Sequence, residues 1–140
     1  MIYNHKIKLI IMLSNSSEEE LGKNIKYWPK DNNTPLILEK DNLKIELINT
    51  ELIAPNAMYL NRIKINNDLE IKHLHVLCWP EFGLPSDEFL ATVIIEKIIV
   101  HVNEQIKNDV ATPIVVHCSA GTGRTGTLIA ICIIIIIYFE

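Results

Sequence analysis

Ile114-Val-Val-His-Cys-Ser-Ala-Gly-Thr-Gly-Arg-Thr-Gly-Thr-Leu128 joins a short apolar run to a glycine-rich turn, and a second apolar run continues to Phe139. The first run has the length of a buried strand and the second that of a helix. A loop curled between a strand and a helix points successive backbone N–H groups at one centre, where the positive end of the helix adds to their field. The stretch therefore predicts a strand, a phosphate-type loop and a helix.

Within this loop, Cys118 and Arg124 stand six positions apart. The field of the loop favours thiolate over thiol, so the pKa of Cys118 should fall below the usual value of about 8.5. The guanidinium of Arg124 offers a planar fork that matches two phosphate oxygens, and the hydroxyl of Thr125 is placed to hydrogen-bond the sulfur. The predicted phosphate-binding residues are Ser119, Ala120, Gly121, Thr122, Gly123 and Arg124. The sequence thus predicts a nucleophile beside an oxyanion site.

The residues before this unit predict a sheet and one further helix. Apolar or alternating segments predict strands at 8–13, 43–48, 59–65 and 71–77, within a region from 36 to 78 that favours several strands. Ser86 is the expected N-cap of a helix that ends near Asn108, because apolar residues then recur every four positions at Leu90, Ile94, Ile98, Val102 and Ile106. The expected architecture is α/β, with a twisted mixed β-sheet flanked by helices, in one domain over 1–140.

Composition narrows the classes of function. The chain has 140 residues, 49% of them hydrophobic, and its 17 acidic and 13 basic residues give a net charge of −4. Since Arg62 and Arg124 are the only arginines, no basic face for nucleic acid is expected. Three scattered cysteines suit a reducing compartment, and the apolar run 128–139 is short of the ~20 residues that span a bilayer, so a cytoplasmic protein is expected.

Taken together, these motifs resemble those of the protein tyrosine phosphatases, in the tyrosine-specific branch. The family signature of His-Cys, five residues, Arg and Ser or Thr is matched at His117, Cys118, Arg124 and Thr125. Residues 8–13 with Tyr-Trp-Pro at 27–29 resemble a second family segment, and residues 73–85 resemble the family's movable acid loop with the strand before it. The residues of these segments resemble those of the tyrosine-specific branch, so a dual-specificity phosphatase is less expected.

The resemblance implies a mechanism. Cys118 would attack phosphorus to give a cysteinyl-phosphate, while Arg124 and the loop amides hold the phosphoryl oxygens. Glu81, in the acid loop Trp79-Pro80-Glu81, would protonate the departing phenolate and then activate water. The implied substrate is a tyrosine-phosphorylated protein, with no metal and no cofactor.

The chain departs from the family pattern in two ways. The acid loop of the family normally ends in Asp, and Glu81 moves the carboxylate by one methylene, which is expected to slow turnover. The family's N-terminal phosphotyrosine loop and C-terminal Gln loop have no match, so a partial domain of marginal stability is expected, with the apolar helix over 128–139 partly uncovered. A catalytically impaired remnant that binds phosphate or phosphotyrosine is therefore the alternative function.

Two other patterns match known motifs in part. Gly121, Gly123 and Gly126 also match the dinucleotide-binding fingerprint, but no following strand with an acidic residue is expected to complete that unit. His73, His75 and Cys78 have the residue types of a metal site, although a histidine pair on the face of a sheet is the favoured interpretation.

Overall fold

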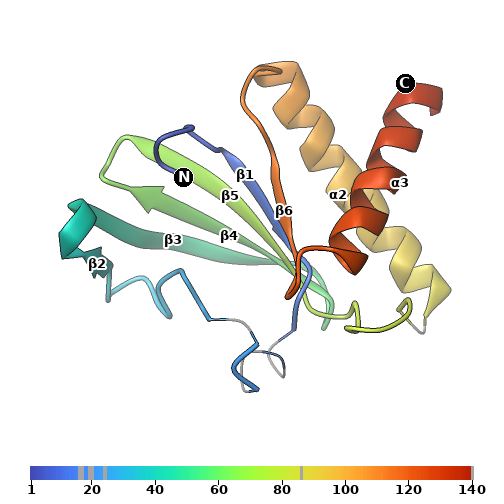
Figure 1. Ribbon diagram of the computed structural model, residues 1–140, viewed down its shortest axis with the longest axis horizontal. Coiled ribbons are helices and arrows are strands. Elements are labelled where there is room, and N and C mark those ends of the chain that lie inside the picture. The colour runs from blue at the N-terminus through green and yellow to red at the C-terminus, as the bar shows by residue number, and fades with distance from the viewer. Residues whose placement is uncertain (16–17, 19–20, 24, 86, 140) are drawn as a thin grey trace.

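In the part of the chain that the structure describes, six strands form one twisted, mixed sheet, with two long helices on one of its faces (Figure 1). The computed structural model describes all residues except 16–17, 19–20, 24, 86 and 140. The strands are β1 (Leu9–Met12), β2 (Leu36–Leu38), β3 (Leu43–Ala54), β4 (Met58–Ile65), β5 (Leu69–Val76) and β6 (Val115–His117). Their order across the sheet is β2-β3-β4-β5-β1-β6. The expected α/β architecture is confirmed.

Strand β1 lies between β5 and β6 and runs parallel to both. The three strands therefore end at the same edge of the sheet, and the segments that follow them converge there (Figure 1). In open α/β sheets the carboxyl edge of the parallel strands is where ligands bind. This edge positions the candidate active site.

The antiparallel part of the sheet is a meander of β3, β4 and β5, with β2 paired outside β3. Strand β3 is longer than the expected segment 43–48, because the register shifts between Leu47 and Asn49 and again between Leu52 and Ala54. Each shift breaks the strict alternation of inward and outward side chains. A prediction from alternation alone therefore places the end of this strand too early.

Helix α2 (Glu88–Asn108) is capped by Asp87, whose carboxylate accepts a hydrogen bond from the backbone N–H of Leu90 at 3.0 Å. Ser86, the expected cap, lies outside the described residues, and Asp87 supplies the cap in the structure. The buried positions of α2 include Ile94, Ile98 and Val102, which pack on the sheet as the four-residue spacing predicts.

Helix α3 (Gly123–Phe139) follows the glycine-rich loop and buries Leu128 in the same core as α2. Its outer surface is apolar, since Ile133, Ile134 and Ile137 are exposed. The expectation of a partly uncovered apolar helix is met by these residues. None of the helices in the described ranges combines the length and the apolar character needed to cross a membrane.

The opposite face of the sheet has its own apolar cluster, which includes Ile10, Met12, Ile63 and Ile71. Trp28 and residues of the first seven positions pack against this cluster, and the two long helices lie on the other face (Figure 1). We call this face, which lies opposite the two helices, the open face, and a row of polar side chains interrupts its apolar surface.

Candidate active site

The loop between β6 and α3 carries Cys118 and leads into the first turn of α3. β6 ends at His117, so Cys118 is the first residue beyond the strand, and the helix begins at Gly123. Gly121 has a φ of 72°, a conformation that a side chain disfavours, which accounts for glycine at this position. The predicted strand, loop and helix are therefore confirmed as local structure.

The thiol of Cys118 is buried at the base of this loop and is contacted by Thr125. The Thr125 hydroxyl donates a hydrogen bond to Sγ at 3.2 Å. Burial tends to raise the pKa of Cys118, but hydrogen bonds from the side chain and backbone of Thr125 and from the backbone of Gly121, with the charge of Arg124, outweigh it. The net result is a pKa below the ordinary value of the thiol, as the sequence predicts. A thiolate is a strong nucleophile.

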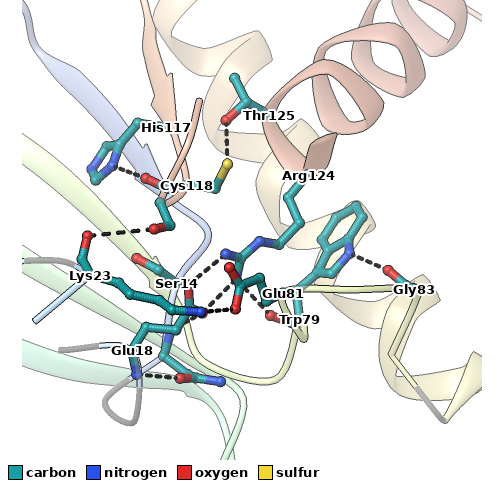
Figure 2. A network of polar contacts seen from close by, with 12 residues as sticks. Ser14, Glu18, Lys23, Trp79, Glu81, Gly83, His117, Cys118, Arg124 and Thr125 are labelled. Carbon is teal, nitrogen blue, oxygen red and sulfur yellow. Dashed lines mark hydrogen bonds and ion pairs between the residues drawn. The ribbon is translucent and has the colours of Figure 1, made fainter. Parts of the chain in front are cut away.

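Arg124 points from α3 towards the end of β1 and forms a buried ion pair with Glu18 (Figure 2). Its Nη1 donates to Glu18 Oε1 at 2.7 Å and its Nη2 to Glu18 Oε2 at 2.6 Å. Nη1 also donates to the backbone carbonyl of Trp79 at 3.1 Å. The guanidinium is thus fixed by the segment after β1 and by the acid loop at once.

Sequence reasoning missed Glu18, which is buried and bonded to Arg124. Hydrogen bonding to Arg124 lowers the pKa of its carboxyl, against a smaller opposing effect of burial. Glu18 is one of three consecutive glutamates, and nothing in the sequence distinguishes the one that reaches an arginine more than a hundred positions away. The only signal is its place in the polar segment that follows a parallel strand.

The acid loop follows β5 and lies beside the loop of Cys118 (Figure 2). Trp79 is buried and its indole N–H donates to the carbonyl of Gly83 at 3.2 Å, which braces the loop. Pro80 is half-buried. The carboxylate of Glu81 accepts from Lys23 Nζ at 2.5 Å. Lys23 is a second contact that the sequence does not indicate.

Lys23 also connects this ion pair to the loop of Cys118. Its backbone carbonyl accepts a hydrogen bond from the Ser119 hydroxyl at 3.4 Å. The segment after β1 therefore contacts both the acid loop and the phosphate-type loop. Three segments that lie far apart in the sequence, around Glu18, Glu81 and Cys118, meet at the carboxyl edge of the sheet (Figure 2).

The remaining predicted residues lie around this centre. Ser119 is half-buried, whereas Ala120, Gly121, Thr122 and Gly123 are exposed at the rim of the loop. His117 is half-buried, and its Nδ1 lies 3.1 Å from the backbone carbonyl oxygen of Cys118. A cleft of about 500 Å³ opens on this side, lined in part by Met12, Tyr27, His117, Cys118 and Gly121. The lining includes Cys118 but not Arg124, whose guanidinium is buried against Glu18, so an oxyanion in this cleft would meet the thiol and the loop first.

His73, His75 and Cys78, whose side chains are of kinds that bind metals, do not form one cluster. His73 and His75 lie on the open face of β5, where His75 Nε2 lies 2.8 Å from the backbone oxygen of Ser14. Cys78 packs against the core on the helical side. Among the residues that the structure describes, no group of three or more His, Cys, Asp or Glu side chains is placed to hold a metal ion.

Comparisons with known proteins agree with these motifs. A family model described as protein-tyrosine phosphatase matches residues 1–138. Tyrosine-protein phosphatase non-receptor type 23 of Homo sapiens is 31% identical over 127 residues, which cover 90% of this chain and 8% of that protein. Tyrosine-protein phosphatase non-receptor type 2 of Rattus norvegicus is 28% identical over an alignment of 140 positions, which covers 96% of this chain and 33% of that protein. The chain spans a third or less of the length of these relatives.

Proposed function

The chain belongs to the protein-tyrosine phosphatase family, and from this premise we propose that it hydrolyses phosphotyrosine in proteins through a cysteinyl-phosphate intermediate. The observation that carries the proposal is the thiol of Cys118. It follows the strand β6, its pKa is lowered by Thr125, Gly121 and Arg124, and it faces a loop built to receive an oxyanion. The substrate is a tyrosine-phosphorylated protein or peptide.

In the first step the Cys118 thiolate attacks phosphorus. The new S–P bond forms as the P–O bond to the tyrosine ring breaks, and the phenolate takes a proton from Glu81. The backbone N–H groups of residues 119–124 receive the phosphoryl oxygens. His117 and Thr125 support the nucleophile through the Cys118 carbonyl and sulfur.

Arg124 can take part while it stays bonded to Glu18. A guanidinium has five N–H donors, and the contacts with Glu18 and the Trp79 carbonyl use both donors of Nη1 and one of Nη2. The remaining Nε–H and Nη2–H lie on one edge of the plane and form a parallel fork. In the proposed mechanism this edge holds the phosphoryl group, because a parallel fork of two N–H groups matches two phosphoryl oxygens.

In the second step Glu81 accepts a proton from water, the water oxygen bonds to phosphorus, and the S–P bond breaks to release inorganic phosphate and the thiolate. Trp79 and Pro80 hold the loop that brings Glu81 to this position. Lys23 binds the carboxylate of Glu81 in the structure, so this ion pair has to open or shift when Glu81 takes part in proton transfer. The reaction needs no metal or cofactor in this proposal.

A catalytically impaired protein that binds phosphotyrosine is the second candidate. The observation that favours it is Glu81, which is longer than the aspartate usual in the family and is tied to Lys23. A reacting group misplaced by about 1 Å can lose on the order of 100-fold in rate. Such a protein keeps the loop that binds the phosphoryl group and loses the proton transfer.

Hydrolysis of p-nitrophenyl phosphate and of a phosphotyrosine peptide separates the two candidates. We expect turnover by the natural chain, none by Cys118→Ser, and near-normal turnover by Cys132→Ser, which removes a thiol from α3 away from the loop. A folded chain that captures the phosphopeptide without turnover supports the second candidate. A folded chain that neither binds nor hydrolyses it refutes both.

A further inference from the structure

A row of polar side chains crosses the open face of the sheet and ends at the residue before the nucleophile. Thr50 on β3 pairs with Asn61 on β4, and Asn61 pairs with His73 on β5 as the directly opposite residue. Asn61 and His73 are buried, and their neighbours on the same face include Ile63 and Ile71. Buried polar groups among isoleucines are costly unless each is hydrogen-bonded.

Every member of this row is bonded to the next. The Thr50 hydroxyl donates to Asn61 Oδ1 at 2.8 Å, and Asn61 Nδ2 lies 3.1 Å from His73 Nδ1. The Tyr27 hydroxyl lies 2.9 Å from His73 Nε2 and 2.7 Å from His117 Nε2, so it bridges β5 and β6 across β1. His117 Nδ1 then reaches the carbonyl oxygen of Cys118 at 3.1 Å.

The direction of the hydrogen bonds follows from His73. Burial is the largest cause that lowers the pKa of His73 well below its usual range, so its ring is neutral and carries one proton. The amide nitrogen of Asn61 can only donate, so His73 Nδ1 accepts and His73 Nε2 carries the proton. His73 Nε2–H therefore donates to the oxygen of Tyr27.

The direction of the hydrogen bonds is also fixed at Tyr27 and His117, up to the active site. Burial raises the pKa of Tyr27 well above its usual value, so the hydroxyl keeps its proton. Because the Tyr27 oxygen accepts from His73, its own proton is directed at Nε2 of His117. His117 then carries its proton on Nδ1 and donates to the Cys118 carbonyl, which can only accept. Donors and acceptors match at every contact.

We propose that Thr50, Asn61, His73 and Tyr27 form one directional hydrogen-bond chain that holds His117 as its neutral Nδ1–H tautomer and thereby positions Cys118. Asn61 is a positioning residue in this series of hydrogen bonds, and strands β5 and β1 lie between its strand and the one that precedes the nucleophile. Its catalytic consequence rests on the proposed phosphatase function, whereas the tautomers can be measured without any activity. Polar networks in a low-dielectric interior are strong when every member is satisfied, which is the case here.

The tautomers are tested by NMR of the chain labelled with ¹⁵N-histidine, at neutral pH. Two-bond and three-bond couplings from the ring protons distinguish a protonated from an unprotonated ring nitrogen. We expect His73 with its proton on Nε2 and His117 with its proton on Nδ1. A proton on Nδ1 of His73 or on Nε2 of His117, or an even mixture at either ring, overturns the proposal.

Variants of Asn61 and Thr50, the residues farthest from Cys118, test whether the series of hydrogen bonds sets the tautomers of His73 and His117. Asn61→Leu keeps the approximate volume and removes the donor to His73, and we expect mixed tautomers at His73 and His117. Thr50→Val is nearly isosteric at an exposed position and releases the amide of Asn61 to rotate, so it gives the same mixing where Asn61→Leu does not fold. Thr50→Ser keeps the hydroxyl and should restore single tautomers. Unchanged tautomers in both Asn61→Leu and Thr50→Val refute the proposal.

Kinetics provide the second readout, with Ile63→Val as the matched control on the same face of β4. A displacement of the nucleophile by a few tenths of an ångström is expected to lower kcat by about tenfold for Asn61→Leu with KM within about twofold. Ile63→Val should leave kcat unchanged. An unaltered kcat in a variant with mixed tautomers contradicts the positioning role. An inactive natural chain with the expected tautomers refutes the proposed function and supports the directional chain.

Discussion

Replacing Glu18 with glutamine removes the negative charge that faces the Arg124 guanidinium. Both side chains of this ion pair are 4% exposed, and its two hydrogen bonds measure 2.7 and 2.6 Å. Breaking a buried ion pair leaves an uncompensated charge and costs about 3–5 kcal/mol. Glutamine keeps one acceptor and turns its NH₂ group toward the guanidinium, so we expect about 3 kcal/mol, or roughly 10 °C in Tm for a protein of this size.

Urea unfolding followed by circular dichroism measures the free energy of unfolding directly. The matched control is Glu104→Gln, because Glu104 bonds Lys72 at 2.7 Å but is 47% exposed, and an exposed ion pair contributes less than about 1 kcal/mol. The double variant of Glu18→Gln with Arg124→Met should lose less stability than the sum of the single variants, because neither charge is then left alone.

The dependence on pH gives a second check of the same reasoning. Hydrogen bonding to Arg124 lowers the pKa of Glu18 in the folded chain, so the stabilisation is present above the ordinary value of 4.5 and is lost as pH falls through the lowered value. The Glu18→Gln variant should lack this acid-dependent loss. A cost below about 1 kcal/mol, equal to that of the exposed control, would refute the view that this ion pair fixes Arg124.

Three further outcomes follow from the structure. Thr125→Val removes the hydroxyl bonded to Cys118 Sγ, so the pH profile of inactivation by iodoacetate should move to higher pH, and an unchanged profile contradicts that role. Hydrogen bonding to the Thr112 hydroxyl and to Lys8 lowers the pKa of Asp109 to about 2. The natural chain should therefore lose stability between pH 3.8 and about 2 in acid titrations, and Asp109→Asn should remove this loss. Ile137 is 67% exposed, so Ile137→Lys should change the free energy of unfolding by less than about 0.5 kcal/mol, and a larger cost in urea unfolding indicates packing at that position.

Much of the fold follows from periodic patterns in the sequence. The segments that became β4, β5 and α2 have uninterrupted alternation or four-residue spacing, and the structure places their apolar residues in the core. Strand β3 runs past the predicted end because two register shifts change which side of the strand faces inward. Such shifts depend on the neighbouring strand, which no single segment encodes.

The candidate site likewise contains some relations that the sequence predicts and others that it does not. Cys118, Arg124 and Thr125 are close in sequence, so their relation could be predicted from spacing alone. Glu18 and Lys23 contact them from a polar segment without periodicity, and their partners are known only once the strands are arranged. The row from Thr50 to His73 likewise depends on strand register. The assignment of roles to Cys118, Arg124 and Glu81 stays a prediction until activity is measured.

The position of β1 between β5 and β6 has a consequence for the order of folding. The antiparallel strands β3, β4 and β5 are joined by tight turns, and such hairpins form within microseconds. The parallel pair of β1 and β6 unites distant parts of the chain and has to close a very large loop, which slows folding in proteins dominated by non-local contacts. The loop of Cys118 and its contacts with Glu18 are therefore expected to form in the late stage of folding, on a hairpin scaffold that is already in place.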